Sequence, residues 1–231
     1  MHILVIDGGH VEAELREKFG PAHEYTFHAM RSDSNWLLKG TAATADVAFI
    51  FACVEEGFTA MDYIPDSLVP TFIETLYASL AGTYWEAKNG KSQRTFFGFC
   101  GLPTLLNRRL LEVSLYQEAD RAKLAETCAA LGTDYRVVAD RVGLVTPRVI
   151  CQIINEACFT VQEGTATMQD VDLGMQLGTS YPRGPFAWAN AIGVERVYAV
   201  LEAMWHDTHD ERYKVCPLLK RQALRGKPFA V

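Results

Sequence analysis

The chain lacks the features that direct a protein to a membrane or to a nucleic acid. No apolar run approaches the roughly 20 residues that a membrane-spanning helix needs. Residues 1–7 have the pattern of a buried strand, without the basic first part and longer apolar stretch of a signal peptide. The formal net charge is −6, so basic side chains are not in excess. We therefore expect a cytoplasmic protein with no nucleic-acid or membrane partner.

Paired cysteines are also missing. The six cysteines are scattered and form no Cys-x-x-Cys pair. Most of them fall in apolar or helical surroundings, so we expect reduced thiols in the core and no metal site. They are Cys53, Cys100, Cys128, Cys151, Cys158 and Cys216.

What is present is a globular composition in which strand and helix patterns alternate. The 231 residues are 49% apolar and 22% charged, enough for a core in one or two domains. The alternation indicates a parallel α/β sheet. We expect strands over 3–6, 25–29, 46–53, 94–99 and 135–139, and helices up to residue 19 and over 68–80 and 119–131.

From residue 146 onward the pattern is helical only. Helices are expected over 148–163, 168–177 and 193–207, with Thr167 as the N-cap of the second. The boundary falls near residue 142 without a linker rich in Gly, Pro or Ser. We therefore expect two domains, residues 1–142 and 143–231.

The turn after the first strand is a damaged dinucleotide fingerprint. Residues 7–12 read Asp-Gly-Gly-His-Val-Glu, and against Gly-x-Gly-x-x-Gly only Gly9 matches. Asp7 also brings negative charge to a place where a pyrophosphate binds, and no acidic residue for the ribose stands at the end of the second strand. Either Gly8, Gly9 and His10, with Arg31, form a retuned nucleotide site, or the turn binds nothing.

A motif in the helical half carries a family resemblance. Residues 181–186 read Tyr-Pro-Arg-Gly-Pro-Phe, preceded by Asp-Val-Asp at 170–172 and by Asn-Glu-Ala at 155–157. These segments resemble the C-terminal domain of the 3-hydroxyacyl-CoA dehydrogenase family. The resemblance implies a shortened Rossmann-like parallel-sheet domain followed by an all-α domain. It also implies NAD as cofactor, an acyl-CoA-like ligand and a homodimer formed through the helical domain.

The resemblance further implies where chemistry is expected. In that family a His takes the hydroxyl proton as hydride leaves to NAD, and a Glu twelve positions later orients it. Residues 110–113, Leu-Leu-Glu-Val, match the context of that Glu, so Glu112 takes its place and Cys100 stands at the His. The substrate-binding Asn of the family is replaced by Pro147. The family's Asn-Thr-Ser-Ser segment has no match in residues 81–95.

Each of these residues has a second interpretation. Cys100 is either a nucleophile or a small buried side chain. Glu112 either serves the site or faces solvent and pairs with Arg108 or Arg109. Pro147 suits the first turn of a helix while offering no polar contact. The apolar side chains of the helical half either line a ligand cleft or form ordinary core; they are Trp188, Tyr198, Met204 and Trp205.

Three functions remain open from the sequence. The first is a divergent member of the family without hydride transfer, acting as a binding or interaction protein, and this is the one we favour. The second is an active NAD-dependent 3-hydroxyacyl-CoA dehydrogenase of fatty-acid metabolism. The third is a repurposed enzyme that uses Cys100.

Overall fold

The computed structural model describes residues 1–29, 44–51, 69–86 and 95–231. The chain forms two compact units. The sheet unit comprises Met1–Gly101 and Leu105–Leu144, and the helical unit comprises Leu102–Thr104 and Val145–Val231. Each unit is described by itself.

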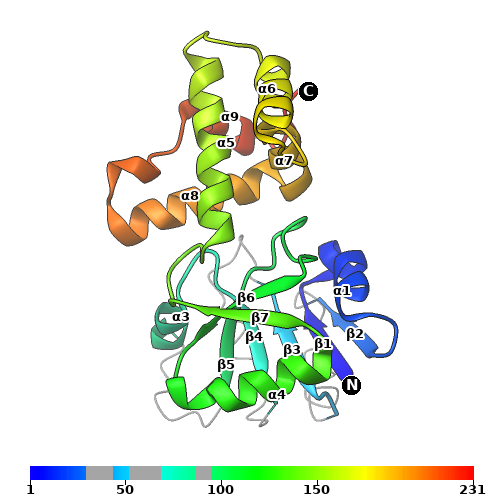
Figure 1. Ribbon diagram of the computed structural model, residues 1–231. Coiled ribbons are helices and arrows are strands. Elements are labelled where there is room, and N and C mark those ends of the chain that lie inside the picture. The colour runs from blue at the N-terminus through cyan, green and yellow to red at the C-terminus, as the bar shows by residue number, and fades with distance from the viewer. Residues whose placement is uncertain (30–43, 52–68, 87–94) are drawn as a thin grey trace. The chain divides into compact units, whose positions relative to one another are not determined.

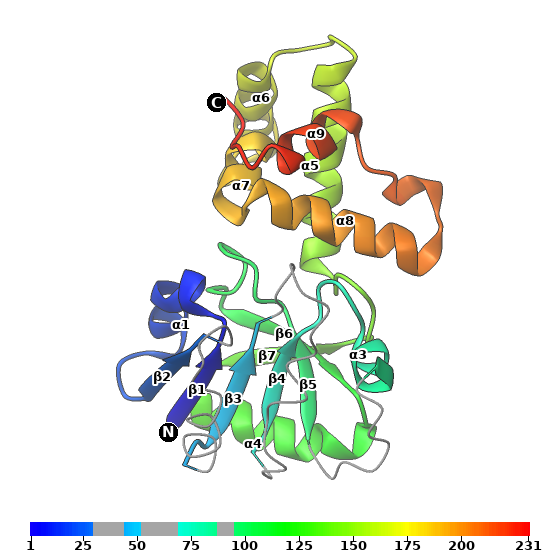
Figure 2. The same ribbon diagram turned by 180° about the vertical axis from the view of Figure 1, so that it is seen from behind.

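The sheet unit contains a mostly parallel sheet whose described part has seven strands. Their order is β2-β1-β3-β4-β5-β6-β7, and Figure 2 shows the first five side by side. All neighbours are parallel except β5 and β6, which are antiparallel. The strands are β1 (His2–Ile6), β2 (Glu24–His28), β3 (Val47–Ile50), β4 (Thr71–Glu74), β5 (Phe96–Phe99), β6 (Leu110–Leu115) and β7 (Asp134–Val138). The expected α/β class is confirmed, and the reversal at β6 is a difference from the all-parallel sheet that the pattern predicts.

Short helices connect the strands. The turn η1 (Gly9–Val11) leads into α1 (Glu12–Phe19), and α3 (Leu80–Glu86) follows β4. The turn η3 (Glu118–Asp120) leads into α4 (Arg121–Leu131), which packs against β7 (Figure 1). As the sequence predicts, α4 ends at Gly132, whose φ of 70° is the left-handed conformation that glycine adopts most easily.

Aromatic side chains fill the core of the sheet unit. Phe49 of β3 stacks on Phe72 of β4 with ring centroids 4.7 Å apart, and the ring of Phe99 meets both edge to face. The strands β3, β4 and β5 have four residues each, and every one of these residues is buried. Strands buried on both faces are typical of a parallel sheet covered by helices.

The helix predicted over residues 68–80 is wrong. The structure has β4 there, followed by a loop and then α3. The strand β4 reads Thr-Phe-Ile-Glu and is buried throughout, so it shows no alternation of apolar and polar residues. In so short a stretch, periodicity cannot separate a buried strand from a buried helix segment.

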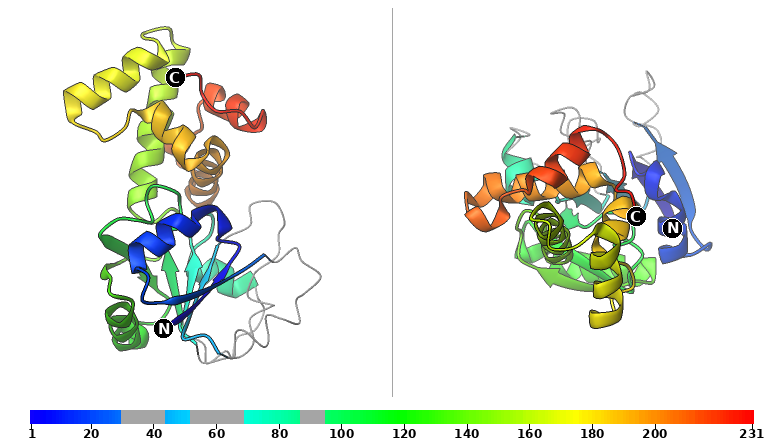
Figure 3. Two further views of the ribbon diagram at one scale, coloured as in Figure 1. Left: turned by 90° about the vertical axis from the view of Figure 1, so that its right-hand side faces the viewer. Right: turned by 90° about the horizontal axis from the view of Figure 1, so that it is seen from above.

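The helical unit packs around one long helix. Its elements are α5 (Thr146–Gln162), α6 (Met168–Thr179), α7 (Pro185–Ile192), α8 (Val194–Thr208), η4 (Glu211–Tyr213) and α9 (Pro217–Leu224). The helices α7, α8 and α9 all contact α5 (Figure 3). The sequence predicts α5, α6 and α8, whereas α7 and α9, eight residues each, were not predicted. In the described part of the chain, no helix is both long enough and apolar enough to cross a membrane.

The Tyr-Pro-Arg-Gly-Pro-Phe motif joins α6 to α7 through a buried carboxylate. Asp172 of α6 is 8% exposed and accepts hydrogen bonds from the backbone N–H groups of Phe186 (2.8 Å) and Ala187 (2.9 Å). These are orphan donors of the first turn of α7, and the helix dipole favours a negative charge there. A Cβ at Gly184 would collide with Asp172, and Pro185 takes the N-terminal position that tolerates proline. The motif residues are therefore the parts of a helix cap.

Two side-chain amides, one buried and one partly buried, fix other parts of the helical unit in a similar way. Asn155 of α5 donates to the carbonyl of Lys214 and accepts from the N–H of Cys216, which sets the start of α9. Asn190 of α7 makes the same paired contact with both backbone groups of Phe229. The predicted cap of α6 is confirmed, because Thr167 and Asp170 form a reciprocal capping box.

Loss of the Asp172 carboxylate should destabilise the helical unit. We expect Asp172→Ala to lower the free energy of unfolding by about 2–3 kcal/mol, since two N–H groups, one of them buried, lose their acceptor. The control is Glu156→Ala, an exposed carboxylate on α5, with an expected change within about 0.5 kcal/mol. Urea unfolding followed by far-UV circular dichroism measures both, and equal effects of the two variants would contradict the capping role.

Candidate functional site

The carboxyl ends of the parallel strands gather the residues that the sequence singles out. The chain goes from β1 outward to β2 and then to β3 on the other side of β1, so the order of the sheet switches direction between β1 and β3. In open α/β sheets, ligands bind in the crevice at such a switch point. The turn Asp7–His10 follows β1, Phe51 follows β3, and Cys100 follows β5.

The ring of Phe51 fills this crevice. A Cβ built on Gly8 would lie 2.5 Å from Cε2 of the ring, and a Cβ built on Gly101 would lie 2.6 Å from Cε1. The ring, 1% exposed, is thus held between two glycines from the ends of β1 and β5. His10 closes the outer side, with its ring edge to face on Phe51 at 5.6 Å. The missing side chain of Gly8 makes room for a phenylalanine of the protein itself.

The turn before α1 has few free donors for a phosphate. The N–H of Val11 donates to the carbonyl of Gly8, and the N–H of Glu12 donates to the carbonyl of Gly9. Asp7 has a φ of 56°, a left-handed conformation that a glycine would adopt at lower cost. The first turn of α1 also carries Glu12 and Glu14.

These residues do not fit the pyrophosphate of a dinucleotide. Glu12 is held by Arg16 of the same helix at 2.8 Å, so that guanidinium is already engaged by a carboxylate. Gly9 is exposed, and a Cβ there would meet no atom within 4 Å. The packing of the protein itself therefore does not require a glycine at position 9. Arg31, the alternative partner of a nucleotide, lies outside the described residues.

Cys100 and Glu112 come together across β5 and β6. The antiparallel register pairs Gly98 with Ser114 and Phe99 with Val113. The same register, continued by one residue, sets Cys100 opposite Glu112. Directly opposite residues of an antiparallel pair have Cβ atoms roughly 4.5–5.5 Å apart. The spacing of twelve residues is therefore the spacing of a cross-strand pair.

The two side chains differ in exposure. Cys100 is 5% exposed, and Glu112 is partly exposed. Arg109, one suggested partner of Glu112, instead pairs with Asp134 at 3.4 Å. A thiol opposite a carboxylate cannot be oriented as an imidazole can, because it has no second nitrogen.

The structure places a second carboxylate, that of Glu74, near Cys100, and the sequence pattern does not indicate it. Glu74, the last residue of β4, is 8% exposed, and a Cβ built on Gly101 would lie 2.5 Å from its Oε1. The β4–β5 register sets Glu74 next to Phe99, one residue before Cys100. A charged residue ending an apolar run was the available signal, and the mistaken helix over 68–80 hid it.

The structure also identifies the segment that follows the fourth strand, β4. It is residues 75–79, Thr-Leu-Tyr-Ala-Ser, which precede residues 81–95, where the sequence has no match to Asn-Thr-Ser-Ser. Thr75 is fully buried, and its hydroxyl has no hydrogen-bond partner among the described residues. The family's serine segment therefore corresponds in position to a stretch of different sequence.

Pro147 belongs to the helical unit. It is buried in the first turn of α5, the position that the sequence predicts for it. Proline has neither a side-chain donor nor a backbone N–H, so this residue donates no hydrogen bond to a ligand.

Burial keeps most thiols outside this site protonated, and a protonated thiol is a poor nucleophile. Burial raises the pKa of Cys128 and of Cys151 to about 12, and it raises the pKa of Cys158 further. Five cysteines are buried and form no disulfide among the described residues, and Cys53 lies outside those residues. Across the described residues, no three His, Cys, Asp or Glu side chains form a group that could hold a metal ion.

The apolar side chains suggested for a ligand cleft divide into two groups. Trp188 and Met204 are buried at 6% and 0% exposure, so they belong to the core of the helical unit. The indole N–H of Trp188 donates to the hydroxyl of Thr104 at 3.0 Å, within the same unit. Tyr198 and Trp205 are partly exposed.

The family match to known proteins lies in the helical half of the chain. Residues 143–228 match the family described as 3-hydroxyacyl-CoA dehydrogenase, C-terminal domain. The chain is 42% identical over 87 residues to the 3-hydroxyadipyl-CoA dehydrogenase of Escherichia coli, covering 38% of this chain and 18% of that protein. It is 37% identical over 89 residues to a probable 3-hydroxybutyryl-CoA dehydrogenase of Bacillus subtilis, covering 38% of this chain and 31% of that one. The matches thus span less than a third of these two relatives.

The fold likeness extends over both units. The crystal structure of FadB2 from M. tuberculosis matches 97% of this chain and 93% of its own, with a TM-score of 0.74 and 19% sequence identity. At that identity the likeness concerns the fold alone.

Proposed function

We propose that this chain, which belongs to the 3-hydroxyacyl-CoA dehydrogenase family, retains the family's scaffold without its hydride transfer and acts as a binding protein. Dehydrogenases of this family use NAD. The observation that carries the proposal is the ring of Phe51 between Gly8 and Gly101. A cofactor that needs the crevice between β1 and β3 would have to displace a fully buried aromatic side chain.

The composition of the Cys100 site supports the same conclusion. Hydride transfer from a hydroxyl requires a base for its proton, and a positioned base contributes roughly 10²–10⁴-fold to the rate. The family's His is replaced by the buried thiol of Cys100, and its Asn by Pro147. The reaction would therefore lack its base and one polar contact to the substrate.

A ligand of the acyl-CoA type remains the proposed partner of the helical unit. Its support is the 42% identity to a relative whose name specifies a CoA thioester, within the matched 87 residues. The buried free thiols favour a reducing compartment, so we propose the cytoplasm as the location.

One observation favours a second candidate. The register that sets Cys100 opposite Glu112 retains a cross-strand pair where the family has its catalytic one. A repurposed enzyme would use Cys100 as nucleophile, and a thiol-directed probe that labels Cys100 faster than a free model thiol would support that candidate.

The proposal predicts that purified protein binds no NADH. Isothermal titration calorimetry should show no saturable heat at micromolar NADH, because the crevice is filled and acidic side chains surround the turn. An NAD-dependent dehydrogenase titrated in the same buffer is the positive control. Saturable micromolar binding would overturn the proposal.

A double variant separates loss of the base from loss of the cofactor site. Cys100→His with Pro147→Asn restores both family side chains without changing Phe51. We expect it to remain unable to oxidise a 3-hydroxyacyl-CoA. Activity of this variant would place the defect in these two side chains and would contradict a closed crevice.

We also propose a homodimer formed through α6. Leu173 and Leu177 lie one helical turn apart, on the same side of α6, and are 55% and 77% exposed. Gly174 and Gly178 on the same helix have no atom within 4 Å of a built Cβ, so a second helix can approach closely. When a two-fold axis relates two copies of the chain, the stripe of Leu173 and Leu177 on one copy can pack against the same stripe on the other.

The dimer predicts a specific effect of charge on α6. Leu177→Glu should shift the chain from dimer to monomer in sedimentation velocity, because it buries a carboxylate in an apolar interface. Glu163→Gln, a change at an exposed residue outside the stripe, should leave the mass unchanged. A monomeric wild-type protein would refute the dimer while leaving the rest of the proposal intact.

A further inference from the structure

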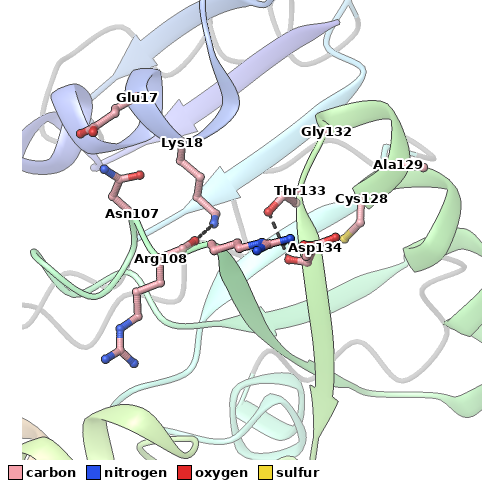
Figure 4. A pocket seen from close by; sticks show the side chains of 10 residues that line it. Glu17, Lys18, Asn107, Arg108, Cys128, Ala129, Gly132, Thr133 and Asp134 are labelled. Carbon is pink, nitrogen blue, oxygen red and sulfur yellow. Dashed lines mark hydrogen bonds and ion pairs between the residues drawn. The ribbon is translucent and has the colours of Figure 1, made fainter.

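The sheet unit contains a cavity outside the crevice that Phe51 fills. Its volume is about 640 Å³, within the range of small-molecule sites. It lies between the last turn of α1, the loop before β6, and the junction of α4 with β7 (Figure 4). Its lining residues are Glu17, Lys18, Asn107, Arg108, Arg109, Cys128, Ala129, Gly132, Thr133 and Asp134.

The cavity contains a partly buried cation, Lys18, to which the described residues offer no counter-ion. Its ammonium donates a hydrogen bond to the backbone carbonyl of Arg108. Among the described residues, no carboxylate lies within ion-pair distance of it. Burial lowers the pKa of Lys18, and the Coulomb effects of Cys128 and Asp134 oppose that shift without removing it. A desolvated cation is costly unless it is paired, so an anion in the cavity would lower the free energy.

The other charged side chains of the lining, two guanidinium groups and two carboxylates, sum to zero, so Lys18 gives the cavity its net positive charge. Arg109, whose side chain is 93% exposed, pairs loosely with Asp134, whose side chain is 64% exposed, at 3.4 Å. Arg108 adds a second guanidinium to the lining, and Glu17 a second carboxylate. Figure 4 shows the side chains of Lys18 and Glu17 pointing in different directions, so the carboxylate of Glu17 does not neutralise Lys18. The titratable lining is completed by Cys128, which burial keeps as a neutral thiol by raising its pKa.

The end of α4 is partly closed by hydrogen bonds. Two of its last four carbonyls are engaged, because Gly132 donates to the carbonyl of Ala129 and Thr133 donates to that of Cys128, which lessens the repulsion of an anion. This double closure is the Schellman arrangement. The cavity also offers the side-chain amide of Asn107 as a hydrogen-bond donor.

We propose that this cavity binds a small metabolite through an oxyanion, a carboxylate or a phosphate, with Lys18 as its counter-ion. Arg109 at the rim gives a second charge-assisted contact. The carboxylates of Glu17 and Asp134 disfavour a polyanion, so the group bound carries a single or low negative charge. None of Gly8, Phe51 and Cys100 lines this cavity, and its occupancy does not depend on the proposed function.

The test measures anion binding by the intact chain. Acetate and inorganic phosphate are the probes, each compared with sodium chloride at equal ionic strength by thermal unfolding and by calorimetry. We expect at least one probe to raise the melting temperature above the chloride control, since a ligand of the folded state stabilises it. The probe that binds more tightly identifies the carboxylate or the phosphate class. Equal melting temperatures in all three salts would overturn the proposal.

The matched variants are Lys18→Met and Lys123→Met. Both remove one lysine charge, but Lys123 lies on α4 in an exposed pair with Glu126. We expect Lys18→Met to weaken binding at least about tenfold, the equivalent of a lost charge-assisted contact, and Lys123→Met to leave it unchanged. Equal binding by wild type and Lys18→Met would overturn the assignment.

Proton linkage provides a readout in the unmutated chain, should Lys18→Met fail to fold. Only the protonated amine pairs with an anion, so affinity should fall as pH rises through the lowered pKa of Lys18. Binding should raise that pKa, and protons should be taken up near it. Carbon-13 methylated lysines followed by NMR report the pKa directly. A low-pKa lysine signal that does not move with either probe would contradict the proposal.

Discussion

The packing of Phe51 between Gly8 and Gly101 is the contact on which the architecture of the sheet unit depends. One ring edge lies against the turn after β1 and the other against the end of β5, so the ring links the carboxyl ends of strands that are not neighbours. It continues inward into the cluster formed by Phe49, Phe72 and Phe99. A glycine turn that a dinucleotide fold uses for a ligand here accommodates a core side chain.

In the helical unit, too, the motif residues have structural roles. Its most specific motif is explained by one cap: the buried carboxylate of Asp172 needs the bare backbone of Gly184 and the proline start of α7. Asn155, in another matching segment, fixes the chain before α9. The residues that identify the family are thus residues that hold helices together. They can persist while the chemistry of the sheet unit changes.

The sequence predicted much of this arrangement and missed identifiable parts of it. The alternation of strands and helices indicated the α/β class, whereas the roles expected of Cys100 and Glu112 stay predictions. The strand β4 was mistaken for a helix, because a run buried on both faces has no strand periodicity, and Glu74 was lost with it. The role of Phe51 depends on contacts between segments far apart in the chain, which no local pattern encodes. Helices α7 and α9 are short, and tertiary packing rather than their own periodicity stabilises them.

The central claim is that the crevice between β1 and β3 is closed to a dinucleotide. Proton–nitrogen correlation NMR of the labelled chain examines it residue by residue, through the backbone amides of Gly8, Gly9 and His10. The account predicts that these signals stay in place when NADH is added up to millimolar concentration. A saturable shift of these amides, with Phe51 leaving its position between the glycines, would contradict it.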